Sequence, residues 1–457
     1  MSTTENKTDT TPDTSLRLVR YLSDQPNWED YDDDQELFIQ EFPKIELHVH
    51  LDGSFDPDFL WKYMKDNPDS VYCLPLQTNL PWDPANKLAV RDLVQSCKTS
   101  KDYHKLCTCR GYRSLHQMLT CFEIFLPLIR GNLDLLEQLA YDFCQRQWEQ
   151  NVVYTEVRYS PHLLAEGYGN GTDGEMVDAE SVVKAVTKGL RRGSHKFGIT
   201  INQIMCGITW RADWALPTVE LANKYRDDYP CAVVGVDIAA GEEHFDQEEH
   251  PELYQSHYDM IQRAKELGLS ITLHAGEMNN DKAVENVKRA INEYGATRIG
   301  HGYRMVENLE LMKEVKEKCV HIEVCPTSSV ETGGWMYKEK NWKEHPVRYF
   351  LKHGLSLSFS SDDPAVFHTS LSWQYRIAMA KMDFTREELL QTNLHAIDAA
   401  FCSEEVKTEL KHRVRCYGAF KKVRHLECKA EMQKAYNRSK SEDDYFSDRV
   451  YVSTEKL

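Results

Sequence analysis

Apolar runs rich in valine, isoleucine and leucine recur along the chain, and most are followed by a polar stretch and then by a segment whose apolar positions have helical spacing. This alternation predicts strands that are joined by helices and therefore pair in parallel. Several runs are almost continuously apolar, as is typical of strands covered on both faces. The expected strands comprise residues 44–50, 152–160, 199–210, 231–239, 270–277, 296–303, 319–326 and 355–363.

Eight strand–helix units predict an α/β protein built as a single closed (β/α)8 barrel of the TIM type. We expect extra helices after the first strand, in an insertion at about residues 70–112 that walls the barrel mouth, and at the C-terminus. The barrel should occupy residues 41–425, between a polar, disordered segment (residues 1–40) and an exposed tail (residues 426–457). The expected helical stretches comprise residues 115–150, 179–196, 218–226, 252–267, 282–294, 309–318 and 386–422.

Charge and cysteine content narrow the class of protein. The 457-residue chain has a formal net charge of −17, which argues against a general affinity for nucleic acid or anionic membranes, since both bind basic surfaces. No apolar stretch is long enough to span a bilayer, and the polar start of the chain lacks the apolar core of a secretory signal. The 13 cysteines follow no disulfide framework. We therefore expect a cytoplasmic enzyme with a small-molecule substrate, and the oligomeric state stays open.

Histidines and an aspartate lie near the ends of four expected strands. His48 and His50 are two residues apart, so their side chains point to the same side of the first strand. His274, His301 and Asp362 lie near the ends of three later strands. Because all strands of such a barrel end at one rim, these side chains should converge. Imidazole and carboxylate groups bind divalent metals such as zinc, so the pattern predicts a metal site.

Two further carboxylates fall beside these candidate ligands. Glu277 follows His274 by three residues, where Gly276 breaks the strand, and near a metal it could donate or accept a proton. Asp363 is adjacent to Asp362, so a regular strand would place the two on opposite sides. A bend after the strand would turn both towards the mouth. Their repulsion would then raise one pKa unless Zn²⁺ offsets the charge.

Other metal patterns are weaker. Residues 321–323 read His-Ile-Glu, which matches the H-x-E of cytidine-deaminase-type zinc sites, but no P-C-x-x-C follows at a workable spacing. Residues 97–109 contain three cysteines and a histidine but lack a second C-x-x-C pair, so ordinary thiols are favoured over a zinc knuckle. A binuclear barrel hydrolase would usually have a bridging lysine at the end of a middle strand. Residues 233–239 have none, which favours one metal.

Five motifs, taken together and in order, resemble those of the adenosine deaminase family. That family is a (β/α)8 barrel with one zinc, which hydrolyses the 6-amino group of adenosine and 2′-deoxyadenosine to give inosine or 2′-deoxyinosine and ammonia, a step of purine salvage. The resemblance extends from about Pro43 to about Phe401. Its motifs are residues 46–53 (ELHVHLDG), 156–162 (EVRYSPH), 274–277 (HAGE), 298–303 (RIGHGY) and 360–364 (SSDDP).

The resemblance also implies roles for individual residues. Glu277 would protonate purine N1 and so make C6 electrophilic. His301 would orient or deprotonate the attacking water, and Asp363 would hydrogen-bond the attacking hydroxide and purine N7. One Zn²⁺ would supply that hydroxide at neutral pH. The implied zinc ligands are His48, His50, His274 and Asp362.

The expected substrate contacts come from His50, Asp52, Gly241 and Asp363. Gly241 would offer its N–H to purine N3, but residues 237–243 are one residue longer before the glycine than the family's usual Asp-Leu-Ala-Gly-Asp-Glu, so Ala240 is an alternative. Asp52 would bind the ribose 5′-hydroxyl. A phosphate at that position would be repelled by roughly 4 kcal/mol at about 4 Å, for an effective dielectric constant of about 20. Asp52 thus favours a nucleoside over a nucleotide.

Two alternatives to an adenosine deaminase stay open. One is a deaminase of a purine nucleotide or modified nucleoside, such as AMP or methylthioadenosine, on the same barrel. The other is a non-catalytic nucleoside-binding paralogue, which would be expected to lose a metal ligand or Glu277. Because every chemical position is intact, we expect activity. Phe122 and Phe125 could line the pocket, but core packing explains them equally well.

Overall fold

A closed parallel barrel forms the centre of the protein. The computed structural model describes residues 33–72, 74, 90–109, 114–165, 177–335 and 341–423. Each of its eight strands pairs in parallel with the next strand along the chain. The (β/α)8 barrel predicted from the sequence is therefore confirmed. The strands are β1 (Lys44–His50), β2 (Val152–Tyr159), β3 (Thr200–Ile208), β4 (Val233–Ala239), β5 (Ser270–Ala275), β6 (Arg298–His301), β7 (His321–Val324) and β8 (Leu357–Phe359).

The barrel closes between its first and last strands, just beyond the end of β8. Asp362 and Val49 form a parallel backbone bridge there. The His50 N–H donates to the Asp362 carbonyl at 2.8 Å, and the Asp362 N–H donates to the His48 carbonyl at 3.1 Å. Closure therefore ties a candidate metal ligand directly to the strand that carries two others.

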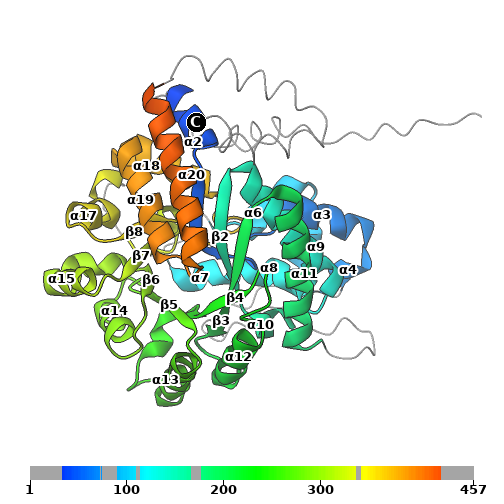
Figure 1. Ribbon diagram of the computed structural model, residues 1–457. Coiled ribbons are helices and arrows are strands. Elements are labelled where there is room, and N and C mark those ends of the chain that lie inside the picture. Colours follow the sequence, from blue (N-terminus) through cyan, green and yellow to red (C-terminus); the bar gives the residue numbers. More distant parts are fainter. Residues whose placement is uncertain are drawn as a thin grey trace, which may run out of the picture.

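Helices surround the barrel, as Figure 1 shows. The expected helix at residues 115–150 is in fact three helices, with a first break at Cys121. The second break follows from the left-handed conformation of Gly131, with φ 69°, after which Asn132 caps a new helix. Helix α17 (Pro346–Lys352) and helix α18 (Leu371–Met382) were not anticipated. The other barrel helices are α7 (Leu115–Thr120), α8 (Phe122–Ile129), α9 (Leu133–Glu149), α10 (Pro161–Ala165), α11 (Ala179–Phe197), α12 (Ala212–Lys224), α13 (Pro251–Glu266), α14 (Ala283–Asn292), α15 (Leu309–Glu317), α16 (Pro326–Glu331), α19 (Arg386–Ala399) and α20 (Glu404–Val423). Short 3-10 helices are η1 (Glu242–Phe245), η2 (Tyr303–Glu307) and η3 (Trp342–Glu344).

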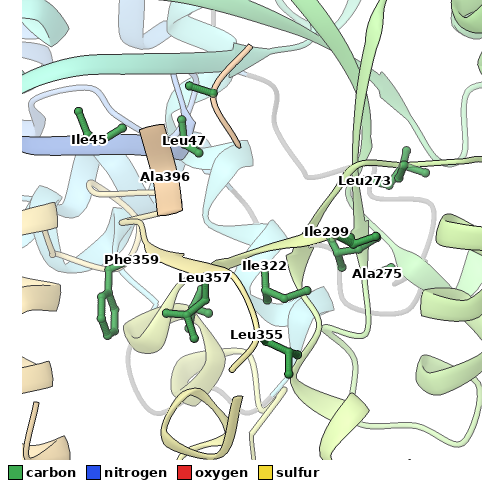
Figure 2. Packing of buried hydrophobic residues seen from close by; sticks show 14 of the residues in the cluster. Ile45, Leu47, Leu273, Ala275, Ile299, Ile322, Leu355, Leu357, Phe359 and Ala396 are labelled. Atoms are coloured by element: carbon green, nitrogen blue, oxygen red, sulfur yellow. The ribbon is translucent and has the colours of Figure 1, made fainter. Parts of the chain in front are cut away.

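The apolar core lies between the strands and the outer helices. Ile45 and Leu47 of β1 are buried next to Ala396 of α19, and apolar residues of β5 to β8 continue the layer (Figure 2). Because side chains alternate along a strand, Glu46 and His48 of β1 face the barrel interior instead. The inside of the barrel is therefore polar beside β1, whereas the layer between the strands and the outer helices is apolar.

The segment before the barrel corrects one expectation. Residues 33–40 were expected to be disordered, but Asp33–Glu41 form helix α2. Its Phe38 and Ile39 are buried in the core, and Phe38 stacks on Phe42 with ring centroids 4.9 Å apart. Burial of this apolar face thus stabilises α2 although its first turn is acidic. Expectations for residues 1–32 and 424–457 fall outside the part of the chain that the structure describes.

Helices inserted between β1 and β2 build a second apolar cluster. Val49 and Phe55 at the end of β1 share this cluster with Phe125, which lies 4.0 Å from Phe55 between ring centroids. Phe125 is fully buried, so core packing accounts for it. Residues 73, 75–89 and 110–112 of the expected insertion fall outside the described ranges. The inserted helices are α3 (Pro57–Asp66), α4 (Asp69–Tyr72), α5 (Val90–Ser96) and α6 (Ser100–Cys107).

No helix among the described residues has the length and apolar composition needed to cross a membrane. The 11 cysteines in the same ranges are unbridged, and most of them are buried.

Candidate active site

The carboxyl ends of the strands bring the predicted metal ligands together. His48 and His50 come from β1, His274 from β5 and His301 from the end of β6, while Asp362 follows β8. His301 and Asp362 adopt left-handed conformations with φ 72° and 64°. Such conformations cost a non-glycine residue about 1–3 kcal/mol and are typical of functional sites. At Asp362 this bend turns the side chain into the cluster, as the sequence argument required.

The spacing of the donor atoms fits a metal ion. One ligand atom each from His48, His274, His301 and Asp362 forms a group whose members all lie within 4.8 Å of one another. Asp362 Oδ1 is 3.2 Å from His48 Nε2 and 3.5 Å from His50 Nε2. His50 Nε2 is 3.2 Å from His274 Nε2. Zinc bonds of about 2.0–2.1 Å in tetrahedral geometry place ligand atoms about 3.3 Å apart. Three imidazoles and one carboxylate at these separations suit a divalent ion. The group within 4.8 Å contains His301, whereas the sequence predicted His50 as the fourth ligand.

Buried carboxylates orient two of these histidines from behind. His48 Nδ1 lies 2.7 Å from Glu323 Oε2, and His274 Nδ1 lies 2.9 Å from Asp237 Oδ2. The His48 Nδ1–H donates to Glu323, so His48 Nε2 keeps its lone pair towards the cluster. Asp237 lies beside His274 Nδ1 as an ionic neighbour. Sequence reasoning did not assign either carboxylate, although Glu323 belongs to the H-x-E segment, which was correctly taken as an inner strand.

Two buried arginines balance the charge of these carboxylates. Arg158 donates to Asp237 and to Glu323 at 2.7 Å each, and Arg298 donates to Glu323 at 2.6 Å and to Glu156. Burial acts to raise the pKa of Glu323, but the two guanidinium groups hold that pKa well below its usual range. The barrel interior is therefore an ion network that ends on the metal-facing histidines.

This network predicts the effect of replacing Glu323 by glutamine. The variant leaves two buried guanidinium groups short of a charge partner, which should destabilise the protein by about 3–5 kcal/mol. It also loses the acceptor for His48 Nδ1–H, so metal affinity should fall by about 10–100-fold. Thermal unfolding of the metal-loaded protein and competition with a chelator measure the two effects. Glu317→Gln, on the exposed face of α15, is the control and should stay within about 0.5 kcal/mol. Unchanged metal affinity in Glu323→Gln would contradict the support assigned to it.

Glu277 and His301 face each other beside the cluster. Glu277 is 3% exposed, and its Oε2 lies 3.7 Å from His301 Nε2. Burial raises the pKa of Glu277 well above the usual carboxyl range, and the charges of Asp362 and Glu242 add to this. Burial also lowers the pKa of His301 well below its usual value. Burial thus favours the neutral form of both groups, which lie side by side.

Tyr303 sets the orientation of the His301 ring. Its hydroxyl lies 3.2 Å from His301 Nδ1 and donates to the Cys325 carbonyl at 3.0 Å. Because that hydroxyl proton is used on Cys325, the oxygen accepts from His301 Nδ1–H. His301 Nε2 then carries the lone pair on the side of the metal ligands.

Asp363 and Asp52 lie together at the mouth, and both are buried. Neither Asp363 Oδ1 nor Asp52 Oδ1 has a hydrogen-bond partner among the residues that the structure describes. Burial raises the pKa of Asp52 to about 7. A Cβ at Gly53 would overlap the Asp363 carboxyl, and a Cβ at Gly300 would lie 2.6 Å from His48 Cε1. Gly53 and Gly300 therefore leave the space that the Asp363 carboxyl and the His48 ring occupy.

The loop after β4 contains the extra residue noted in the sequence. Ala240 adopts a positive φ of 86°, whereas Gly241 has an ordinary φ of −67°. The longer loop is thus accommodated at Ala240, immediately before the glycine. Glu243, two residues beyond Gly241, lies 2.6 Å from His116 of α7.

The competing metal candidates do not form a second site among the described residues. His321 bonds Ser356 and Ser358 at 2.8 and 2.9 Å. His104 Nε2 lies 2.7 Å from His368 Nδ1, and Cys107 is fully buried in the second apolar cluster.

Comparisons with known proteins agree with this geometry. The family model described as adenosine deaminase matches residues 43–417. Adenosine deaminase from Xenopus tropicalis is 34% identical over 381 residues, which are 82% of this chain and 96% of the relative. An amidohydrolase from Burkhoderia ambifaria with bound Zn has a TM-score of 0.66 at 20% identity, covering 85% of this chain and 96% of its own. The N6-methyl-AMP deaminase from Arabidopsis thaliana has a TM-score of 0.63 at 24% identity, covering 83% and 98%. These two solved structures share the fold.

Proposed function

Because the chain belongs to the adenosine deaminase family, it is a hydrolytic deaminase, and we propose that it converts adenosine and 2′-deoxyadenosine to inosine and 2′-deoxyinosine with one Zn²⁺ as cofactor, as a step of purine salvage. The observation that carries this proposal is the convergence of His48, His274 and Asp362 beside buried Glu277. In the reaction, a water oxygen bonds to purine C6, the bond from C6 to the exocyclic nitrogen breaks, and ammonia leaves.

His48, His50, His274 and Asp362 would hold the zinc in this proposal. When bound, zinc lowers the pKa of a coordinated water to about 7, so that hydroxide is available at neutral pH. The separations of the donor atoms support this assignment, as does the Zn in the related amidohydrolase structure. His301 is left as the base, since its ring is held by Tyr303 with Nε2 free to accept a proton.

The remaining groups act on the purine and the ribose. Glu277 donates its proton to N1, which draws electron density away from C6 and prepares it for attack. Purine N7 has only a lone pair, so Asp363 must present a proton to bond it. The N–H of Gly241, or of Ala240, bonds N3. Asp52 accepts from the ribose 5′-hydroxyl, and its unpartnered buried oxygen supports a ligand contact there.

Asp52 predicts which substrate is used, and an assay of adenosine beside AMP tests the proposal. Above its pKa of about 7 the Asp52 carboxylate is charged, so a substrate phosphate beside it would be repelled by roughly 4 kcal/mol at about 4 Å. The assay is therefore run above that pH. We expect kcat/KM for AMP to be about 10²–10³-fold lower than for adenosine, because part of this repulsion is relieved by solvent and movement. Loss of absorbance as the 6-amino group is removed measures both rates.

The Asp52→Asn variant is the partner experiment. It should lower kcat/KM for adenosine by about tenfold, because the hydrogen bond to the 5′-hydroxyl is weaker. It should also reduce the difference in kcat/KM between adenosine and AMP. Preference of the unmodified protein for AMP or N6-methyl-AMP would overturn the assignment of Asp52 and favour a nucleotide deaminase. Absence of turnover with any of these substrates, in metal-loaded protein, would favour a nucleoside-binding role.

A further inference from the structure

Glu242 is a buried carboxylate that the proposed mechanism does not use. It follows Gly241 at the start of η1 and is 1% exposed. Its side chain is directed at the turn after β5, which carries Glu277, rather than at the cluster of metal ligands. A carboxylate buried this completely must be satisfied by donors from the protein.

The donors are the backbone N–H groups of the turn itself. Glu242 Oε2 accepts from the N–H of Glu277 at 3.0 Å and from the N–H of Met278 at 2.9 Å. Oε1 accepts from the N–H of Gly276 and, at 3.2 Å, from Asn286 Nδ2. Four donors thus use the roughly four lone-pair positions that one carboxylate offers.

The turn needs such an acceptor because of its shape and burial. Gly276 has a φ of 73°, and a Cβ there would lie 2.7 Å from Val287 Cγ2 and 3.1 Å from Gly302 Cα. These N–H groups follow the end of β5 at Ala275, so among the described residues no neighbouring strand bonds them. Buried N–H groups without partners are costly. Glu242 supplies the partners from a different strand loop.

From these contacts we propose that Glu242 is a positioning residue, which fixes the turn at residues 276–278 and thereby places the Glu277 carboxyl at purine N1. This inference rests on the proposed function for Glu277. Glu242 also links two parts of the purine subsite, because the adjacent residue Gly241 is expected to contact N3. N1 and N3 belong to the same six-membered ring, so a single anchor sets the spacing of both contacts.

Glu242→Gln is the variant that tests the anchor, and Glu243→Gln is its matched control. Glutamine has one acceptor oxygen, and its NH₂ group would face the N–H donors of the turn. Glu243 bonds His116 instead, and among the described residues it accepts no hydrogen bond from the backbone N–H groups of residues 276–278. Both variants are prepared as full-length, metal-loaded protein, and metal content is measured before each assay.

The first measurement is hydrogen–deuterium exchange of the peptide that spans residues 276–278. It should be faster by at least tenfold in Glu242→Gln than in the unmodified protein or in Glu243→Gln. This measurement requires no substrate, so it tests whether Glu242 fixes the turn even if adenosine is not turned over and the proposed function fails. Unchanged exchange overturns the anchor.

The second measurement is turnover of adenosine. We expect kcat to fall by about 10–100-fold in Glu242→Gln, with metal content unchanged, as is usual when a supporting residue is lost. In a Glu277→Gln background, Glu242→Gln should cost no more than about twofold further, because the two act as one unit. Glu242→Asp should recover part of the loss. Faster exchange with unchanged kcat, or full additivity with Glu277→Gln, overturns the positioning role.

Discussion

Replacing Glu277 by glutamine should lower kcat for adenosine by about 10³-fold while the metal stays bound. The buried carboxyl is the group placed to protonate N1, and its burial raises its pKa well above the usual range, which favours the protonated acid. General acid catalysis by a positioned side chain typically contributes about 10²–10⁴-fold. Glutamine keeps the shape of the side chain and can still donate a hydrogen bond, but it cannot transfer a proton.

Steady-state kinetics of the variant on adenosine, with metal content determined in the same preparation, measure this loss. KM should change by less than about threefold, since an interaction that acts in the transition state lowers kcat and kcat/KM together. Glu277→Asp, which restores an acid on a shorter arm, should recover part of the rate. Retention of more than a tenth of the rate in Glu277→Gln would assign the protonation of N1 to another group.

The barrel and most of the metal site follow from local patterns. Strands with apolar residues on both faces, followed by amphipathic helices, are characteristic of this fold, and His48, His274 and Asp362 stand where such strands end. Strand ends meet at one rim whatever their distance in the sequence, so the convergence of these side chains could be inferred without knowing any contact. The N-terminal helix was missed because its acidic start hid the apolar face formed by Phe38 and Ile39.

The supporting layer could not be inferred in the same way. Arg158 and Glu323 are charged residues within largely apolar runs, 165 positions apart, and nothing local to either indicates that they pair. Glu242 is one of two consecutive glutamates, and only the structure distinguishes the one that binds the turn from Glu243, which bonds His116. Contacts between different strand loops depend on register around the whole barrel, which a pattern in one segment does not encode.

Removing the metal should abolish deamination altogether. If His48, His50, His274 and Asp362 hold one Zn²⁺, incubation with a strong chelator should reduce turnover of adenosine below about 10⁻³ of the starting rate, since hydroxide at neutral pH then has no source. Addition of one equivalent of Zn²⁺ should restore the rate, and Mg²⁺ should not, because Mg²⁺ prefers oxygen ligands in octahedral geometry.

The ligand assignment is tested by comparing His274 and His301, two histidines of the cluster. Loss of a true ligand in His274→Ala should lower the bound metal to well below one per chain, and activity should fall with it. His301→Ala should keep the metal, because His301 is assigned to the attacking water, and should lower kcat by about 10²–10⁴-fold. Both variants leave Asp362 in place, so the comparison isolates the imidazoles. The same metal measurement is made on His50→Ala. If His301→Ala loses the metal and His50→Ala retains it, the roles of these two histidines are exchanged, and His301 is the fourth ligand of the cluster.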